Sequence, residues 1–257
     1  MPPHDYLKPT VGSRAWALTR FVLSAAAVSL ALHFALREPW IGVALVFALL
    51  GFGLPQLRAR QRLRELLSSG DLRAILELWN DAIETLPHHR TVGPLIRATA
   101  LAAHGLTDRA RGVLERAERG LAWENALEHR LFLETLLDAF EGRRVQALDK
   151  ARALRSLPLP ASPWAKSRAS VLRGAAGALA RAFAHCAEKD DAERLRLAAK
   201  HHPLVHWAMR YALAVVHLDQ GRRDEALALV SAAPDWPQGS AFKAFQAEIV
   251  EHGLRRG

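Results

Sequence analysis

Four glycines, each between two amphipathic segments, recur along the chain after residue 57. They are separated by intervals of 35, 37 and 79 residues, the last being about two periods: Gly70, Gly105, Gly142 and Gly221. A period of this size with helical hydrophobic spacing predicts a stack of helix–turn–helix units. Runs of alternating β-branched residues are scarce in the same region. The sequence therefore predicts an all-α domain.

Residues at fixed distances from these glycines are mostly small. The positions five residues after, seven before and twelve after the glycine are Ile75, Ala110, Ala147 and Ala226; Leu63, Ala98, Thr135 and Ala214; and Ala82, Ala117, Leu154 and Ala233. Prolines close three units, at Pro87, Pro158 and Pro234, where they stop the second helix. Small side chains at these positions allow paired helices to approach closely.

This pattern resembles the tetratricopeptide repeat over roughly residues 58–237. The sequence departs from the family pattern at Ile75, Thr135 and Leu154, and it lacks the usual tryptophan early in the first helix. The resemblance implies an α-solenoid whose first helices line a concave groove. Carried over to this chain, the predicted partner-binding residues are Leu95, Thr99, Phe132, Leu136, Phe140, Tyr211, Val215 and Leu218.

The predicted groove is apolar and aromatic. The lysine and asparagine with which some family members grip a C-terminal carboxylate are absent from these positions, so an apolar helix or extended segment of a partner is the expected ligand. The alternative is that the irregular unit and the last helix fold inward and use these aromatic side chains as core.

The long interval before Gly221 predicts one degenerate unit without a turn glycine. Its helices run through "ASVLRGAAGALARAFAHCA" and "AERLRLAAKHHP", with a turn near Glu188–Asp190 and an extra loop at Ser156–Trp164 before it. The segment Ser240–Leu254 places Phe242, Phe245 and Ile249 on one face. It is predicted to be a capping helix at the open end of the stack.

Two apolar segments precede the repeats. Residues 15–36 contain one charge, Arg20, and residues 40–57 contain none, so each has about the length needed to cross a bilayer as a helix. Only "REP" connects them, which predicts a transmembrane helical hairpin over residues 15–57. A cleaved signal peptide is the main alternative for the first segment, although the second follows it at once.

The flanking charges predict the orientation of this hairpin. Lysine and arginine residues precede the first segment and follow the second, whereas Arg37 in the turn is offset by Glu38. The positive-inside rule then places both termini in the cytoplasm. The predicted organisation is a cytoplasmic tail (1–14), the hairpin (15–57) and the helical-repeat domain (58–257) of an integral membrane protein.

The chain is basic, with 35 lysine and arginine residues against 26 acidic ones. Part of the excess lies directly after the second apolar segment, at Arg58, Arg60, Arg62 and Arg64. Few aromatic residues are interleaved there for base stacking, so nucleic acid is not the predicted partner. Anionic lipid headgroups are the predicted partner of these arginines, because they lie next to the predicted end of the membrane segment. The alternative is that these arginines only set topology.

No pattern in the sequence predicts catalysis, a cofactor or a metal site. The acidic run "EKDDAER" is better explained as a helix start, and the paired histidines suit helix C-termini. A single cysteine, Cys186, excludes an internal disulfide and is predicted to be a buried thiol. The predicted function is a membrane-anchored cytoplasmic adaptor that captures unidentified partner proteins. The alternatives are a subunit or assembly factor whose hairpin makes the specific contacts, or an uncharacterised enzyme.

Overall fold

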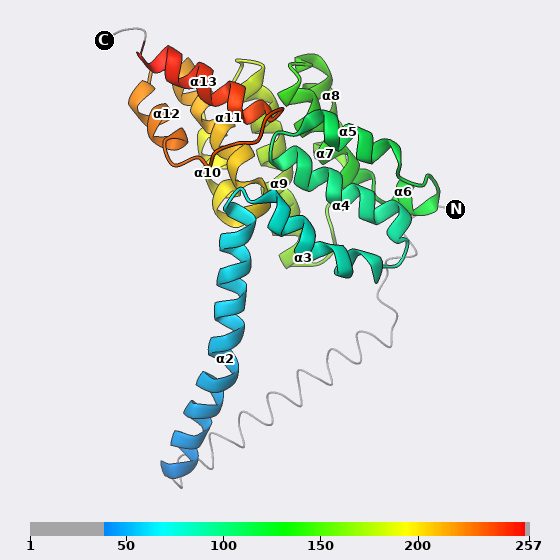
Figure 1. Cartoon of the computed structure of the whole chain (residues 1–257), viewed down its shortest axis with the longest axis vertical. Helices are drawn as coiled ribbons and strands as arrows, with labels where there is room; N and C mark the ends of the chain where they lie inside the picture. Colours follow the sequence, from blue (N-terminus) through cyan, green and yellow to red (C-terminus); the bar gives the residue numbers. More distant parts are fainter. Residues whose placement is uncertain (1–38, 255–257) are drawn as a thin grey trace. The chain divides into compact units, whose positions relative to one another are not determined.

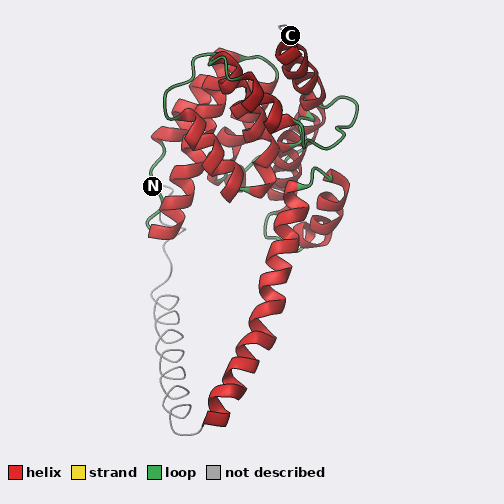
Figure 2. Ribbon diagram, turned by 90° about the vertical axis from the view of Figure 1, so that its left-hand side faces the viewer, coloured by secondary structure: helices red, strands yellow, loops and turns green. Residues whose placement is uncertain are grey.

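The computed structural model describes the backbone of residues 39–254 and the side chains of residues 54–252. Every regular element in this part of the chain is a helix (Figure 2), which confirms the predicted all-α class. The first predicted membrane segment and the N-terminal tail lie outside the described residues, so the hairpin stays a prediction. The chain divides into two compact units between Leu63 and Arg64.

Helix α2 (Pro39–Ser68) covers the second predicted membrane segment and the four arginines that follow it. It is continuous across Leu57 and Arg58, so no flexible linker separates them. Pro55 lies inside the helix and cannot donate to the backbone ladder. Among the helices that the structure describes, none is long and apolar enough to cross a membrane.

After α2 the chain forms consecutive antiparallel helix pairs (Figure 1). The helices are α3 (Leu72–Glu84), α4 (His89–Ala103), α5 (Thr107–Glu115), α6 (Leu121–Asn125), α7 (Leu127–Phe140), α8 (Arg144–Ser156), α9 (Pro163–Phe183), α10 (Asp191–His201), the 3₁₀ turn η2 (Pro203–Val205), α11 (His206–Asp219), α12 (Arg223–Val230) and α13 (Ala241–Leu254). The pairs are α4–α5, α7–α8, α9–α10 and α11–α12.

The pairs stack in sequence order into two layers. The first helices α4, α7, α9 and α11 contact one another in turn, and the second helices α8 and α10 pack against the first helix of the next pair. Nine of the positions predicted to be small or closely packed are buried: Ile75, Ala98, Ala110, Ala117, Thr135, Ala147, Leu154, Ala214 and Ala226. Leu63 and Ala82 are exposed and Ala233 is half-buried, because these three lie at the ends of the stack.

The predicted turn glycines all adopt the left-handed backbone conformation. Gly105, Gly142 and Gly221 have φ values of 73°, 73° and 74°, and Gly70 has a φ of 85°. In the turns of the first three, the glycine N–H donates to the carbonyl three residues earlier and the next N–H donates to the carbonyl five residues earlier. This is the Schellman motif, which satisfies carbonyls at the helix end and favours glycine.

The irregular unit uses the same motif without glycine. Its turn starts earlier than the predicted Glu188–Asp190, because α9 ends at Phe183 and His185 takes the left-handed conformation, with a φ of 56°. The N–H of Cys186 donates to the carbonyl of Arg181, which completes the motif. The prediction of a buried thiol was wrong, because this turn exposes Cys186.

The C-terminal segment returns to the beginning of the stack. Ser240 Oγ donates to the carbonyl of His104 over 2.7 Å, and the Ala241 N–H donates to the carbonyl of Gly105 over 2.8 Å. Gly105 also faces this segment so closely that an added Cβ would lie 2.7 Å from Ser240 Oγ. Helix α13 then packs beside α11 and α12 (Figure 1). The predicted C-terminal helix is present as α13, and the face predicted to be apolar turns inward, with Phe242 and Ile249 buried and Phe245 half-buried.

Candidate partner-binding site

The residues predicted to line a concave groove are mostly buried. Leu95, Thr99, Phe132, Leu136, Phe140 and Tyr211 are all less than 9% exposed, and Val215 and Leu218 are half-buried. Except for Leu95 and Thr99, the buried residues belong to one core cluster together with Phe242, Trp236 and Ile249 of the C-terminal segment. The fold therefore brings the predicted aromatic residues together, but not on a surface.

Helix α13 and the segment before it cover these side chains. The Tyr211 ring stacks on Phe242 with centroids 4.7 Å apart, and Trp236 Nε1 donates to the Tyr211 hydroxyl over 2.7 Å. Phe140 meets Phe242 edge to face at 5.2 Å. The expectation of an open groove is thus not met, and the alternative in which the aromatics serve as core describes the structure. Partner binding by these residues requires the C-terminal segment to leave first, and it stays a prediction.

The four arginines predicted to bind lipid are exposed on α2. Successive helical residues are about 100° apart, so Arg58 and Arg62 lie on one side of the helix while Arg60 and Arg64 lie on the other. A helix lying flat on a membrane surface would gather its cations on one face. The four arginines instead lie on opposite sides of the helix.

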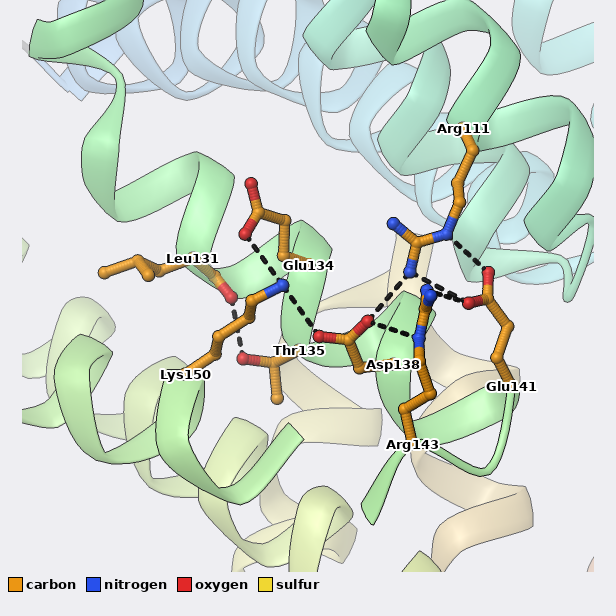
Figure 3. A network of polar contacts seen from close by, with 8 residues as sticks. All are labelled: Arg111, Leu131, Glu134, Thr135, Asp138, Glu141, Arg143 and Lys150. Atoms are coloured by element: carbon orange, nitrogen blue, oxygen red, sulfur yellow. Dashed lines mark hydrogen bonds and ion pairs between the residues drawn. The ribbon is translucent and has the colours of Figure 1, made fainter. Parts of the chain in front are cut away.

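Figure 3 shows a polar network centred on Asp138, whose side chain is 3% exposed. Its carboxylate pairs with Lys150 at 2.7 Å, Arg111 at 2.8 Å and Arg143 at 3.0 Å. Glu141 accepts from Arg111 on the same side of the network. The partners come from α5, α7, α8 and the Gly142 turn, so the network joins two adjacent helix pairs.

This network has a structural rather than a catalytic arrangement. Burial by itself lowers the pKa of the Lys150 ammonium, but hydrogen bonds to Asp138 and Glu134 outweigh it and raise this pKa above its ordinary value. A lysine held charged cannot act as a base at neutral pH. In the part of the chain with described side chains, no three His, Cys, Asp or Glu residues are grouped so as to hold a metal ion.

A surface cleft of about 700 Å³ lies between α8, α9 and α10. Its walls contain five guanidinium groups and one carboxylate: Arg152, Arg155, Arg173, Arg181, Arg194 and Glu188. Between them lie the apolar side chains of Leu148, Ala151, Leu159, Val171 and Leu197, of which Leu159 and Leu197 are exposed. This mixture of apolar surface and hydrogen-bond donors is typical of binding sites.

A buried carboxylate fixes one wall of the cleft. Asp191, at the start of α10, is fully buried and accepts from Arg181 Nε over 2.8 Å and from the backbone N–H of Glu188 over 2.8 Å. Burial alone would raise the pKa of Asp191, but these hydrogen bonds and the charges of Arg181 and Arg194 hold it below its ordinary value. The acidic run interpreted as a helix start thus also anchors the arginines.

The sequence interpretation did not find this cleft. Two signals were present: Gly174 and Gly177 stand three residues apart inside a helix, and Arg152 and Arg155 stand three residues apart on another. Both spacings place side chains on one helix face. Only the fold shows that the two faces border the same cleft.

Comparison with family models, with curated proteins and with solved structures found no match.

Proposed function

We propose that this protein is a membrane-anchored cytoplasmic adaptor that uses a stack of helix pairs to hold another protein near the bilayer. The observation that carries the proposal is α2, which continues from the second apolar segment through the four arginines to Ser68 without a linker. Apolar residues followed directly by arginines on one helix are the order expected where a helix leaves a bilayer on the cytoplasmic side.

The arrangement of the arginines supports an anchor with both termini in the cytoplasm. Cations around a helix at a membrane exit contact anionic headgroups at about 1 kcal/mol each and oppose translocation. The array of helix pairs supports an adaptor role, because stacked helical units present extended surfaces for protein partners.

The topology is tested with a reporter enzyme that is active only outside the cytoplasm. Fused at Gly257 it should be silent, and fused after Leu36 it should be active. Activity of the fusion at Gly257 would rule out the hairpin.

The adaptor role is tested by replacing residues 15–57 with an unrelated two-span anchor. Proteins that co-purify from membranes with the natural chain should also co-purify with the exchanged chain, because an adaptor binds through its helical domain. Loss of the same proteins would favour the alternative, in which the hairpin makes the specific contacts within a membrane complex.

A further inference from the structure

Two helical glycines are among the residues that line the cleft between α8, α9 and α10. Gly174 and Gly177 lie inside the 21-residue helix α9 and are both partly exposed. A Cβ added at Gly174 would meet only Arg194 Cδ at 4.0 Å, and one added at Gly177 would meet Arg181 at 3.5 Å or more. These are ordinary contacts, so packing within the chain does not require glycine at either position.

Glycine inside a helix is nevertheless unfavourable relative to alanine. Neither residue has a positive φ. The two glycines therefore weaken α9 without a reason inside the domain. What they provide is helix surface without side chains of its own, open at Gly174 and bordered by the Arg181 guanidinium at Gly177, where another chain can approach the backbone closely.

The walls of the cleft determine what such a chain must contain. Arg155 forms no hydrogen bond or ion pair with the residues that the structure describes, and Arg152 pairs only with Asp149 at the surface. Arg181 of α9 and Arg194 of α10 are already paired, both with the buried Asp191 and with Glu188, which also lines the cleft. The guanidinium donors of Arg152 and Arg155 on α8, together with the exposed Leu159 and Leu197, complement a segment with carboxylates on the edge that faces α8 and apolar residues beside them.

The dimensions favour a peptide over a small anion. The lining residues of α9 run from Ser170 to Arg181, about three helical turns or 17 Å. A free phosphate would leave most of this length and the exposed Leu159 and Leu197 uncovered. A short helix with apolar side chains on one face and acidic ones at its margins would cover them.

We propose that the cleft between α8, α9 and α10 binds an acidic amphipathic helix of a partner protein, with its closest approach at Gly174 and Gly177. This inference rests on the proposed adaptor function and names the surface and the chemical class of the partner. It does not depend on the anchor, because the cleft lies wholly within the helical domain.

The test uses the full chain in nanodiscs of neutral phosphatidylcholine and a fluorescein-labelled peptide, ELLEELLEELLEEL, followed by fluorescence anisotropy. Empty nanodiscs give the background. Arg155→Glu should weaken binding by about tenfold or more, because it converts an unpaired cation into a like charge. The matched control is Arg196→Glu, an exposed arginine of α10 outside the cleft, which should change affinity by less than about twofold.

The double variant Gly174→Ala with Gly177→Ala separates binding from folding. Its melting temperature should rise or stay the same, because alanine favours the helix, while peptide affinity falls by about tenfold or more. Unchanged affinity in this variant and in Arg155→Glu would overturn the proposal. So would equal binding of a peptide with lysine in place of every glutamate. Displacement of the peptide by nanodiscs that contain phosphatidylserine would instead assign the cleft to the membrane. None of these results would alter the topology test, so failure of the cleft and failure of the anchor can be told apart.

Discussion

Replacing Phe242 with alanine should strongly destabilise the helical domain. Phe242 is fully buried, and its ring lies 4.7 Å from Tyr211, 5.0 Å from Trp236 and 5.2 Å from Phe140, centroid to centroid. Truncating a buried phenylalanine costs about 3–5 kcal/mol, and losing several ring contacts places the expected value in the upper part of that range. For a domain of this size the melting temperature should fall by about 6–20 °C.

The measurement is thermal and urea unfolding of the full chain in nanodiscs, followed by circular dichroism and tryptophan fluorescence. Val250→Ala is the matched control, because Val250 lies on the same helix but is 37% exposed. It should cost less than about 1 kcal/mol. Hydrogen exchange of the α13 amides gives a local measurement beside the global one.

A loss of less than about 1 kcal/mol for Phe242→Ala would refute the reasoning. It would mean that α13 does not hold the core together, and that Tyr211 and Phe140 are available on an open concave face. A loss of about 3–5 kcal/mol in the free energy of unfolding, together with faster amide exchange across the whole domain, would show that the C-terminal segment is part of one cooperative core.

Three further perturbations test other parts of the structure. Asp138→Asn should cost about 2–4 kcal/mol in urea unfolding, because three cations lose a buried partner, whereas Glu77→Gln at an exposed pair should cost less than about 0.5 kcal/mol; equal effects would contradict the role of the network. His185→Gly should stabilise the domain by about 0.5–1 kcal/mol and Gly142→Ala should destabilise it by about 1 kcal/mol, because both turns need a residue in the left-handed conformation. If both variants changed the free energy of unfolding in the same direction, the two turns would not share this motif. Thermal stability should fall between pH 7 and pH 5, because burial lowers the pKa of five histidines that the unfolded chain protonates below about pH 6.5: His104, His129, His202, His206 and His217. A melting temperature that rises on acidification would contradict this prediction.

The local structure was largely predictable because it depends on nearby residues. A turn that needs a positive φ selects glycine, so the spacing of Gly70, Gly105, Gly142 and Gly221 located the helix pairs. The irregular unit was harder, because His185 fills the same conformation and histidine is not a strong turn signal. Its helices were predicted, while its turn was placed a few residues too late.

The repeat pattern could not predict whether the concave face is open or covered by the C-terminal segment. That pattern determines how each pair packs on the next, but whether the chain ends fold back depends on single long-range contacts. Ser240 with His104 and Trp236 with Tyr211 are such contacts, and they link residues far apart in the sequence. An apolar first-helix position has the same composition whether it faces a groove or a core, so the aromatic residues alone could not decide between them.

The irregular unit explains why the candidate cleft lies where it does. Helix α9 has 21 residues against 14 for α7 and for α11, and the extra loop before it brings Leu159 beside the end of α8. The chain's own C-terminal segment covers the inner face, whereas the irregular unit at α9 borders an outer cleft that is lined by arginines. The same unit carries the two glycines that packing within the domain does not require. We therefore interpret the long helix, the inserted loop and the glycines together, as one modification of the stack that shapes the proposed binding cleft.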